Sequence, residues 1–435
     1  MTDQIDSQTA ARLIEALDAG RLDYLFQTAH IDYSERDGLT GTSHALGLAP
    51  DAVEHLVSAV RRAQGLTILA GAWGDYSSWI MLSADLLGLL HETDIRSTFD
   101  FRAATDMPDD EVRLLTNTIL VEEVLQLGLT FGEISPTDEV ELSQARTAAR
   151  RMLFEDTEPA SPYEQWVQRF YGLMQLLPEL AELPLTFDRL VELHGLLTAG
   201  LSLEPGVLRS SDSPGAVETG ASADGVGVPA VRVASEMRAI AAYGTAPQRP
   251  FVHPLIKVLV YFYWIRRIKP FTEANGLFAR LVIHIYEYQQ GYRSLPFTPL
   301  TRWASSQWAA SPPLETPDGR FDATTFVIDR LRLFLRAYTE AEHEVRVSIQ
   351  RFQALEVRFA SVDINHRQAR ILEDALAAPT TVFTIKRHAR SRGLAYETAR
   401  QDFRGLMRAG YLEQQRRGRQ FEFRLAKDAH KRLPK

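Results

Sequence analysis

The sequence predicts a mainly α-helical protein whose last domain adds a β-hairpin to three helices. Through most of the chain, apolar residues recur at helical spacing, as in Asp51–Ala63 and Leu185–Leu201, and such spacing gives a helix one apolar face. Near the C-terminus, Tyr411–Gln415 and Gln420–Leu425 alternate around a Gly-containing turn, a pattern typical of paired strands. We therefore expect a helical body followed by a small winged-helix domain.

Composition excludes several classes of protein. The chain has 435 residues, of which 45% are hydrophobic, and this is enough for two or three domains. It contains no Cys, so disulfides, thiolate metal sites and cysteine nucleophiles are excluded. The N-terminal segment does not resemble a signal peptide, and the sequence has no run of about 18 apolar residues. We therefore expect a cytoplasmic protein with no membrane partner.

Charge is distributed unevenly along the chain. Residues 384–435 contain 15 Lys or Arg and 5 Asp or Glu, which gives a local charge of +10. Since the whole chain has a net charge of −8, the other residues together carry −18. A basic module on an acidic body favours a nucleic-acid partner for that module alone.

The helical patterns and their breaks divide the chain into five regions. A segment rich in Gly, Ser and Pro at 204–230 is expected to be a loop or hairpin, because apolar helices resume on both sides of it. The predicted regions are an N-terminal helical region at 1–110, a helical region at 111–184, a core at 185–335, a helical spacer at 336–361 and a winged helix at 362–427.

A polar loop, Lys269–Arg280, lies between two apolar segments that we expect to be buried helices. Asn275 and Gly276 allow a close backbone turn, and the amides at the start of the following helix would attract an anion. Glu273 offers an oxygen ligand for Mg²⁺, and Arg280 lies about one turn into the helix, where it would reach a phosphate. Each residue also has a structural explanation as a turn, a helix-end carboxylate or an ion-pair partner.

The order of these residues resembles the Fic family motif, H-P-F-x-D/E-G-N-G-R-x-x-R. The resemblance covers about residues 185–300 and includes His194, Pro205–Arg209 and His253-Pro254-Leu255. It implies a Fic-type helical core with a small β-hairpin flap at residues 210–230. It also implies transfer of a nucleotidyl group, usually AMP from ATP, to a hydroxyl of a protein target.

The sequence departs from this motif at three positions. Lys269 stands in place of the catalytic His, Ala274 replaces the first Gly, and Leu277 replaces the first Arg. A lysine amine is ordinarily protonated at neutral pH and is a poor proton acceptor. We therefore expect AMP transfer to be lost or altered. ATP and Mg²⁺ would still be held through Asn275, Gly276 and Arg280, with Glu273 at the metal.

A second pattern suggests internal inhibition. Many Fic proteins carry an inhibitory helix with the pattern S/T-x-x-x-E-G/N, and Thr118–Glu123 is similar to it except at the last position. The resemblance implies that Glu122 pairs with Arg280. The alternative is an amphipathic helix with exposed acidic side chains.

The basic C-terminus reads as three helices, at 364–377, 384–392 and 395–408, followed by the hairpin. This segment resembles the helix-turn-helix domains that often follow Fic cores. The third helix would present its polar face to DNA, and the hairpin would approach the backbone or minor groove. The expected DNA contacts are Tyr396, Thr398, Arg400 and Gln401 on the helix, and Arg416, Arg417 and Arg419 on the hairpin.

Three functions remain open at this point. The first is a Fic-like protein with a degenerate AMP-transferase motif that acts as a DNA-binding regulator, with dimerisation through the helical body. The second is an active transferase that modifies a protein hydroxyl by unusual chemistry, with Lys269 in the catalytic position. The third is a structural or partner-binding protein, because winged helices also bind proteins.

Overall fold

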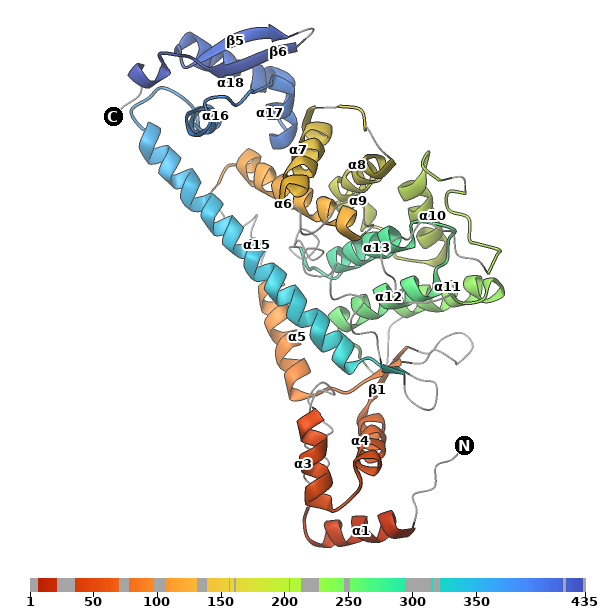
Figure 1. Cartoon of the computed structure of the whole chain (residues 1–435). Coiled ribbons are helices and arrows are strands. Elements are labelled where there is room, and N and C mark those ends of the chain that lie inside the picture. Colours follow the sequence, from red (N-terminus) through yellow and green to blue (C-terminus); the bar gives the residue numbers. More distant parts are fainter. Residues whose placement is uncertain are drawn as a thin grey trace. The chain divides into compact units, whose positions relative to one another are not determined.

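The computed structural model is mainly α-helical, as the sequence predicts (Figure 1). The chain forms two compact units. Unit 1 comprises residues 1–96, 180–291 and 306–335, and unit 2 comprises residues 97–179, 292–305 and 336–435. The residues that the structure describes are 7–21, 36–69, 78–97, 107–130, 139–155, 157–159, 162–202, 204–212, 227–245, 251–293, 314–315, 321–417 and 420–432.

Unit 1 combines helices with a small sheet. Its elements are α1 (Ser7–Asp18), α3 (Arg36–Leu46), α4 (Pro50–Gln64), β1 (Leu66–Leu69), β2 (Ser78–Ile80), α5 (Ala84–Ser97), α10 (Phe187–Thr198), α11 (Ala230–Thr245), α12 (Pro254–Ile268), α13 (Asn275–Gln289), β3 (Leu314–Glu315), β4 (Phe321–Asp322) and the start of α15 (Thr324–Phe359).

Helices α12 and α13 form the centre of unit 1. Both are apolar on nearly all sides, and consecutive residues such as Val258–Val260 and Leu281–Ile283 are buried. A helix that is apolar all round is stable only when neighbours cover every face. The two helices pack against each other, and α10 and α11 also pack on them. The loop between α12 and α13 is therefore held by a rigid frame.

The sheet of unit 1 joins segments that are far apart in the sequence. Its strand order is β1-β2-β4-β3, in which β2 and β4 are parallel and the other neighbours are antiparallel. Strands β1 and β2 lie in the N-terminal region that the sequence analysis predicted as helical, so that part of the prediction was incomplete. The strands are only two to four residues long, which is too short for alternation to be recognised.

A buried ion pair fixes α4 to the last residue of strand β4. Arg61 and Asp322 are each 2% exposed, and the Arg61 Nε lies 3.0 Å from the Asp322 Oδ2. The other carboxylate oxygen of Asp322 accepts hydrogen bonds from the backbone N–H and the hydroxyl of Thr324, at 2.9 and 2.5 Å. Thr324 is the first residue of α15, so these hydrogen bonds also hold the N-terminus of that helix against Asp322.

Unit 2 is helical and ends in a hairpin. Its elements are α6 (Asp109–Thr130), α7 (Glu139–Glu155), α8 (Pro162–Gln175), α9 (Leu177–Leu180), the remainder of α15, α16 (His366–Ala377), α17 (Ile385–Arg392), α18 (Tyr396–Arg408), β5 (Leu412–Arg417), β6 (Gln420–Leu425) and a final 3₁₀ turn, η2 (Ala429–Arg432). Among the described residues, no helix has the length and apolar character needed to cross a membrane.

Residues 364–432 form the C-terminal domain, with α16, α17 and α18 packed on the antiparallel β5–β6 hairpin. Leu372, Phe403 and Leu406 are completely buried in its core, where Phe403 stacks on Phe423 with ring centroids 4.5 Å apart. The first helix begins with a capping box, in which Asn365 and Gln368 each bind the other's backbone N–H. The same hydrophobic core also includes Leu355 and Phe359 from the end of α15.

We predict that Asp322→Ala destabilises the protein by about 3 to 5 kcal/mol, because Arg61 stays buried after losing its carboxylate partner. Chemical denaturation followed by circular dichroism measures this change. The control is Asp85→Ala, which removes an ion pair with Arg332 whose side chains are 62% and 50% exposed. That control should cost about 1 kcal/mol or less. Equal effects of the two substitutions would contradict the prediction.

Candidate functional site

The loop between α12 and α13 is bounded by two residues with unusual backbone conformations. Helix α12 is followed by Lys269, with φ 46° and ψ 67°, and α13 is preceded by Ala274, with φ 59° and ψ 20°. Among the described residues, these are the two non-glycine residues with positive φ. Left-handed backbone of this kind costs roughly 1–2 kcal/mol for an L-residue. Local strain therefore marks the same loop that the sequence motif identified.

Asn275 closes this loop with its side chain. Its Oδ1 accepts a hydrogen bond from the backbone N–H of Phe271, and its Nδ2 donates to the carbonyl of the same residue, both at 3.0 Å. The side chain is buried, with 4% of Asn275 exposed. Both functional groups of the amide are thus used to hold the loop. The predicted contact between Asn275 and a nucleotide stays a prediction.

His194 on α10 contacts the loop through its imidazole ring. The Gly206 N–H donates to its Nδ1 at 3.1 Å, so Nε2 carries the ring proton and donates to the Glu273 carbonyl at 3.2 Å. The ring also stacks on Phe271, with centroids 3.5 Å apart. Burial lowers the pKa of His194 to about 4, although the hydrogen bond to Glu273 opposes this shift. His194 is therefore a neutral connector at physiological pH.

Arg209 connects the C-terminal end of α12 to the two edges of the predicted flap. Its guanidinium donates to the carbonyls of Ile268 at 3.1 Å and Lys269 at 2.5 Å, which lie at the C-terminal end of a helix, where carbonyls have no intrahelical donor. It also donates to the carbonyls of Ser211 and Val228. The predicted flap between these two residues lies largely outside the described residues, which resume at Gly227.

The side chains at the motif positions differ in their surroundings. Lys269 is 8% exposed and Arg280 is 7% exposed, whereas Leu277 is 2% exposed and belongs to the apolar core. Burial, followed by the charge of Arg280, lowers the pKa of His284. Leu277 stands where the motif has its first Arg, so this position supplies an apolar side chain to the core instead of a cation to the loop.

Three further predicted residues are Gly276, Glu273 and Glu122. Gly276 and Glu273 are both partly exposed, and Glu273 contacts His194 through its carbonyl. That contact uses the backbone and not the carboxylate of Glu273. The predicted role of this carboxylate as a metal ligand therefore stays a prediction with which the contact does not interfere. Glu122 lies in α6, but its side chain is outside the described residues, and its predicted pairing with Arg280 stays a prediction.

The C-terminal domain presents the second group of predicted residues (Figure 1). Helix α17 ends at Gly393, with φ 64°, and α18 begins three residues later at Tyr396. This is the spacing of a helix-turn-helix, in which the second helix meets the DNA. Tyr396 is 57% exposed, and Gln401 is exposed on the same helix.

An acidic residue, Glu397, lies in the first turn of this exposed helix. Glu397 accepts hydrogen bonds from Arg400 at 2.8 Å and from Gln401 at 2.7 Å, and Arg404 lies 4.0 Å from it. Two predicted DNA contacts, Arg400 and Gln401, are therefore bound to a carboxylate. The spacing of three and four residues along a helix was visible in the sequence and signals such pairs.

The remaining predicted contacts are on or near the hairpin and helix. Arg416 and Arg417 are exposed on β5, and Thr398 is partly exposed on α18. Arg419 lies outside the described residues. Sequence reasoning missed Asp402, which is 2% exposed and binds Arg367, Asn365 and His388 within the domain. Burial opposes ionisation of Asp402, but these hydrogen bonds outweigh it and hold its pKa well below the usual range.

We predict that Ala274→Gly stabilises the protein by about 1 kcal/mol, because glycine adopts positive φ without the steric cost borne by alanine. Thermal and chemical unfolding measure the change. Ala279→Gly, within α13, is the matched control and should instead destabilise the protein by about 1 kcal/mol or more. A destabilising effect at position 274 would mean that the left-handed conformation is not a source of strain.

Comparison with known proteins gives similarity at the level of structure. No protein-family model matches the sequence, and no curated protein matches it. A Fic family protein from Desulfovibrio desulfuricans G20 aligns with a TM-score of 0.46 at 16% identity, over 80% of this chain and 97% of that one. Two structures of Fic-1 from C. elegans align with TM-scores of 0.43 at 16% identity, over 74% of this chain and 84% and 85% of theirs.

Proposed function

We propose that this chain is a Fic-type protein with a degenerate transfer motif that acts as a DNA-binding regulator. The observation that carries the proposal is the helix-turn-helix formed by α17 and α18, followed by a hairpin with exposed arginines. A recognition helix enters the major groove, while a basic hairpin contacts phosphates nearby. The local charge of +10 over residues 384–435 supports the same assignment.

The loss of ordinary AMP transfer is supported by two features of the loop. A transferring enzyme needs a group that accepts the proton of the target hydroxyl, and at position 269 an amine replaces the imidazole that the motif has there. It also needs cations around the phosphates, and Leu277 is a core residue at one of the cation positions. Nucleotide binding without transfer is the outcome most consistent with the retained Asn275, Gly276 and Arg280.

We predict no detectable transfer of label from radiolabelled ATP and Mg²⁺ to the wild-type chain or to added proteins. Lys269→His supplies a proton acceptor and should raise transfer by about a hundredfold or more if the loop still binds ATP. Leu277 is left unchanged, since Leu277→Arg would bury a charge in the core and cost several kcal/mol.

The alternative function is an active transferase that uses Lys269. Lys269→Ala is the control that separates the two functions, because it removes the amine without adding a base. Strong transfer by the wild type that disappears in Lys269→Ala would establish the alternative and refute the loss of activity.

For the DNA-binding function, the contacts of Glu397 are the critical feature. Arg400 and Gln401 both donate to this carboxylate. Contacts with DNA through the same donors would replace those with Glu397, and the carboxylate itself repels phosphate. Glu397 therefore acts against non-specific association.

We predict that the full chain binds random duplex DNA at low salt, as measured by fluorescence anisotropy, and that Glu397→Gln tightens this binding several-fold. Glu413→Gln on β5 is the matched control for net charge and should have a smaller effect. Arg417→Ala should weaken binding to all sequences and reduce the slope of log affinity against log salt by roughly 1. A folded wild-type chain that fails to bind any duplex at low salt would overturn the proposed function.

A further inference from the structure

Helix α6 contacts the end of α17 and the turn that follows it. The two helices pack against each other within unit 2. Among the residues that the structure describes, α6 contacts three consecutive positions of this segment, Ser391, Arg392 and Gly393. These positions lead into α18, the proposed recognition helix, which begins at Tyr396.

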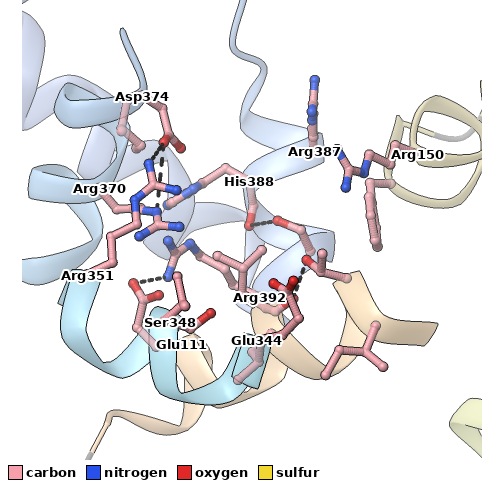
Figure 2. Close-up of a pocket in the computed structure, with 18 of the residues that line it drawn as sticks. Glu111, Arg150, Glu344, Ser348, Arg351, Arg370, Asp374, Arg387, His388 and Arg392 are labelled. Carbon is pink, nitrogen blue, oxygen red and sulfur yellow. Dashed lines mark hydrogen bonds and ion pairs between the residues drawn. The ribbon is translucent and has the colours of Figure 1, made fainter. Parts of the chain in front are cut away.

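The contacts of α6 with Ser391 and Arg392 are polar and buried. The Asn117 Nδ2 donates to the Ser391 carbonyl at 3.0 Å, in the last turn of α17, where carbonyls have no intrahelical donor. The Arg392 Nη1 lies 2.7 Å from the Glu111 Oε1 and 2.9 Å from the Asp110 Oδ2. Glu111 and Arg392 line one wall of a cavity in unit 2 (Figure 2). Because separation would leave a buried charge without its partner, these contacts keep α6 beside the turn.

The two carboxylates of this contact are used within the protein. The Asp110 Oδ1 also lies 2.9 Å from the Nε2 of His366, at the start of α16. Burial opposes ionisation of Asp110, but its hydrogen bonds with His366 and Arg392 and their charges outweigh burial and lower its pKa. Asp110 and Glu111 therefore bind the C-terminal domain through its basic side chains.

Arg113, on the same helix, lies against the turn itself. Gly393 has φ 64°, and a Cβ at this position would overlap the Arg113 guanidinium. Arg113 is exposed, and in the part of the chain that the structure describes its side chain has no hydrogen bond or ion pair. Its donors are therefore available to a ligand at the turn before α18.

The location of Arg113 suits a contact with the DNA backbone. The first residues of a recognition helix contact base edges in the major groove, which is about 12 Å wide between its two phosphate backbones. Tyr396 follows Gly393 by three residues, and a segment of that length spans about 11 Å at most. A guanidinium at Gly393 is therefore within reach of the backbone that borders the groove, and its planar donors match phosphate oxygens.

We propose that Arg113 is a further DNA contact, which α6 supplies from outside the C-terminal domain and which binds a backbone phosphate beside the start of α18. The inference rests on the proposed DNA-binding function. Backbone contacts fix the orientation of a protein on the duplex without reading sequence. The DNA-binding surface thus combines two segments that are far apart in the sequence and are joined by the contacts of Asn117, Glu111 and Asp110.

The experiment is fluorescence anisotropy of the full chain on random duplex DNA over a range of salt concentrations. Arg113→Gln should weaken binding roughly fivefold at low salt and reduce the slope of log affinity against log salt by about 1. Arg113→Lys keeps the charge and should retain most of the slope. The matched control is Arg346→Gln, which removes a 67% exposed charge on α15 and should change affinity and slope much less.

The outcomes separate this inference from the proposed function. Arg113 is exposed, so its variants should stay folded, and circular dichroism checks this. Binding that is weakened by Arg417→Ala but unchanged by Arg113→Gln would overturn the role of Arg113 and leave the proposed function intact. Equal losses in Arg113→Gln and Arg346→Gln would also overturn it, because they would reflect net charge alone. A folded wild-type chain that binds no duplex would refute the function and this inference together.

Discussion

The connection between α12 and α13 is the constraint on which unit 1 depends. Two apolar helices that bury nearly every face must be joined by a short segment, and that segment begins and ends with left-handed residues. The Asn275 amide and the His194 ring both hold it through hydrogen bonds to its backbone. With these polar groups satisfied inside a closely packed region, the loop has little freedom to rearrange. A ligand there would meet a largely preformed surface.

Sequence analysis predicted the parts of the fold that depend on long, regular patterns. The buried pair α12 and α13, the three helices after residue 364 and the final hairpin all follow from periodicity, and their limits lie close to those expected. The sheet in unit 1 was missed because β2 pairs with β4, which is more than 230 residues later. Pairing between such distant short strands leaves no local signal.

The same distinction applies to the candidate sites. Lys269, Asn275 and Arg280 were identified from their order in a motif, and they occur together around one loop. What the motif could not reveal is the work each side chain does within the fold, such as the closure of the loop by Asn275. The partners of Asp402 and Arg392 come from segments between 14 and 282 residues away, so only the folded chain brings them together.

The contacts of Arg209 have a consequence for how this protein can vary. One guanidinium holds Ser211 and Val228, which lie near the two ends of the predicted flap, and also the end of α12. Arg209 therefore holds Ser211 and Val228 in place whatever the length of the segment that connects them. Because loop-closure entropy rises only slowly with length, insertions between these anchors would leave the core almost unaffected. The chain can thus accept changes in the length and sequence of this segment, whether by evolution or by the insertion of a reporter peptide, while the loop beside it keeps its shape.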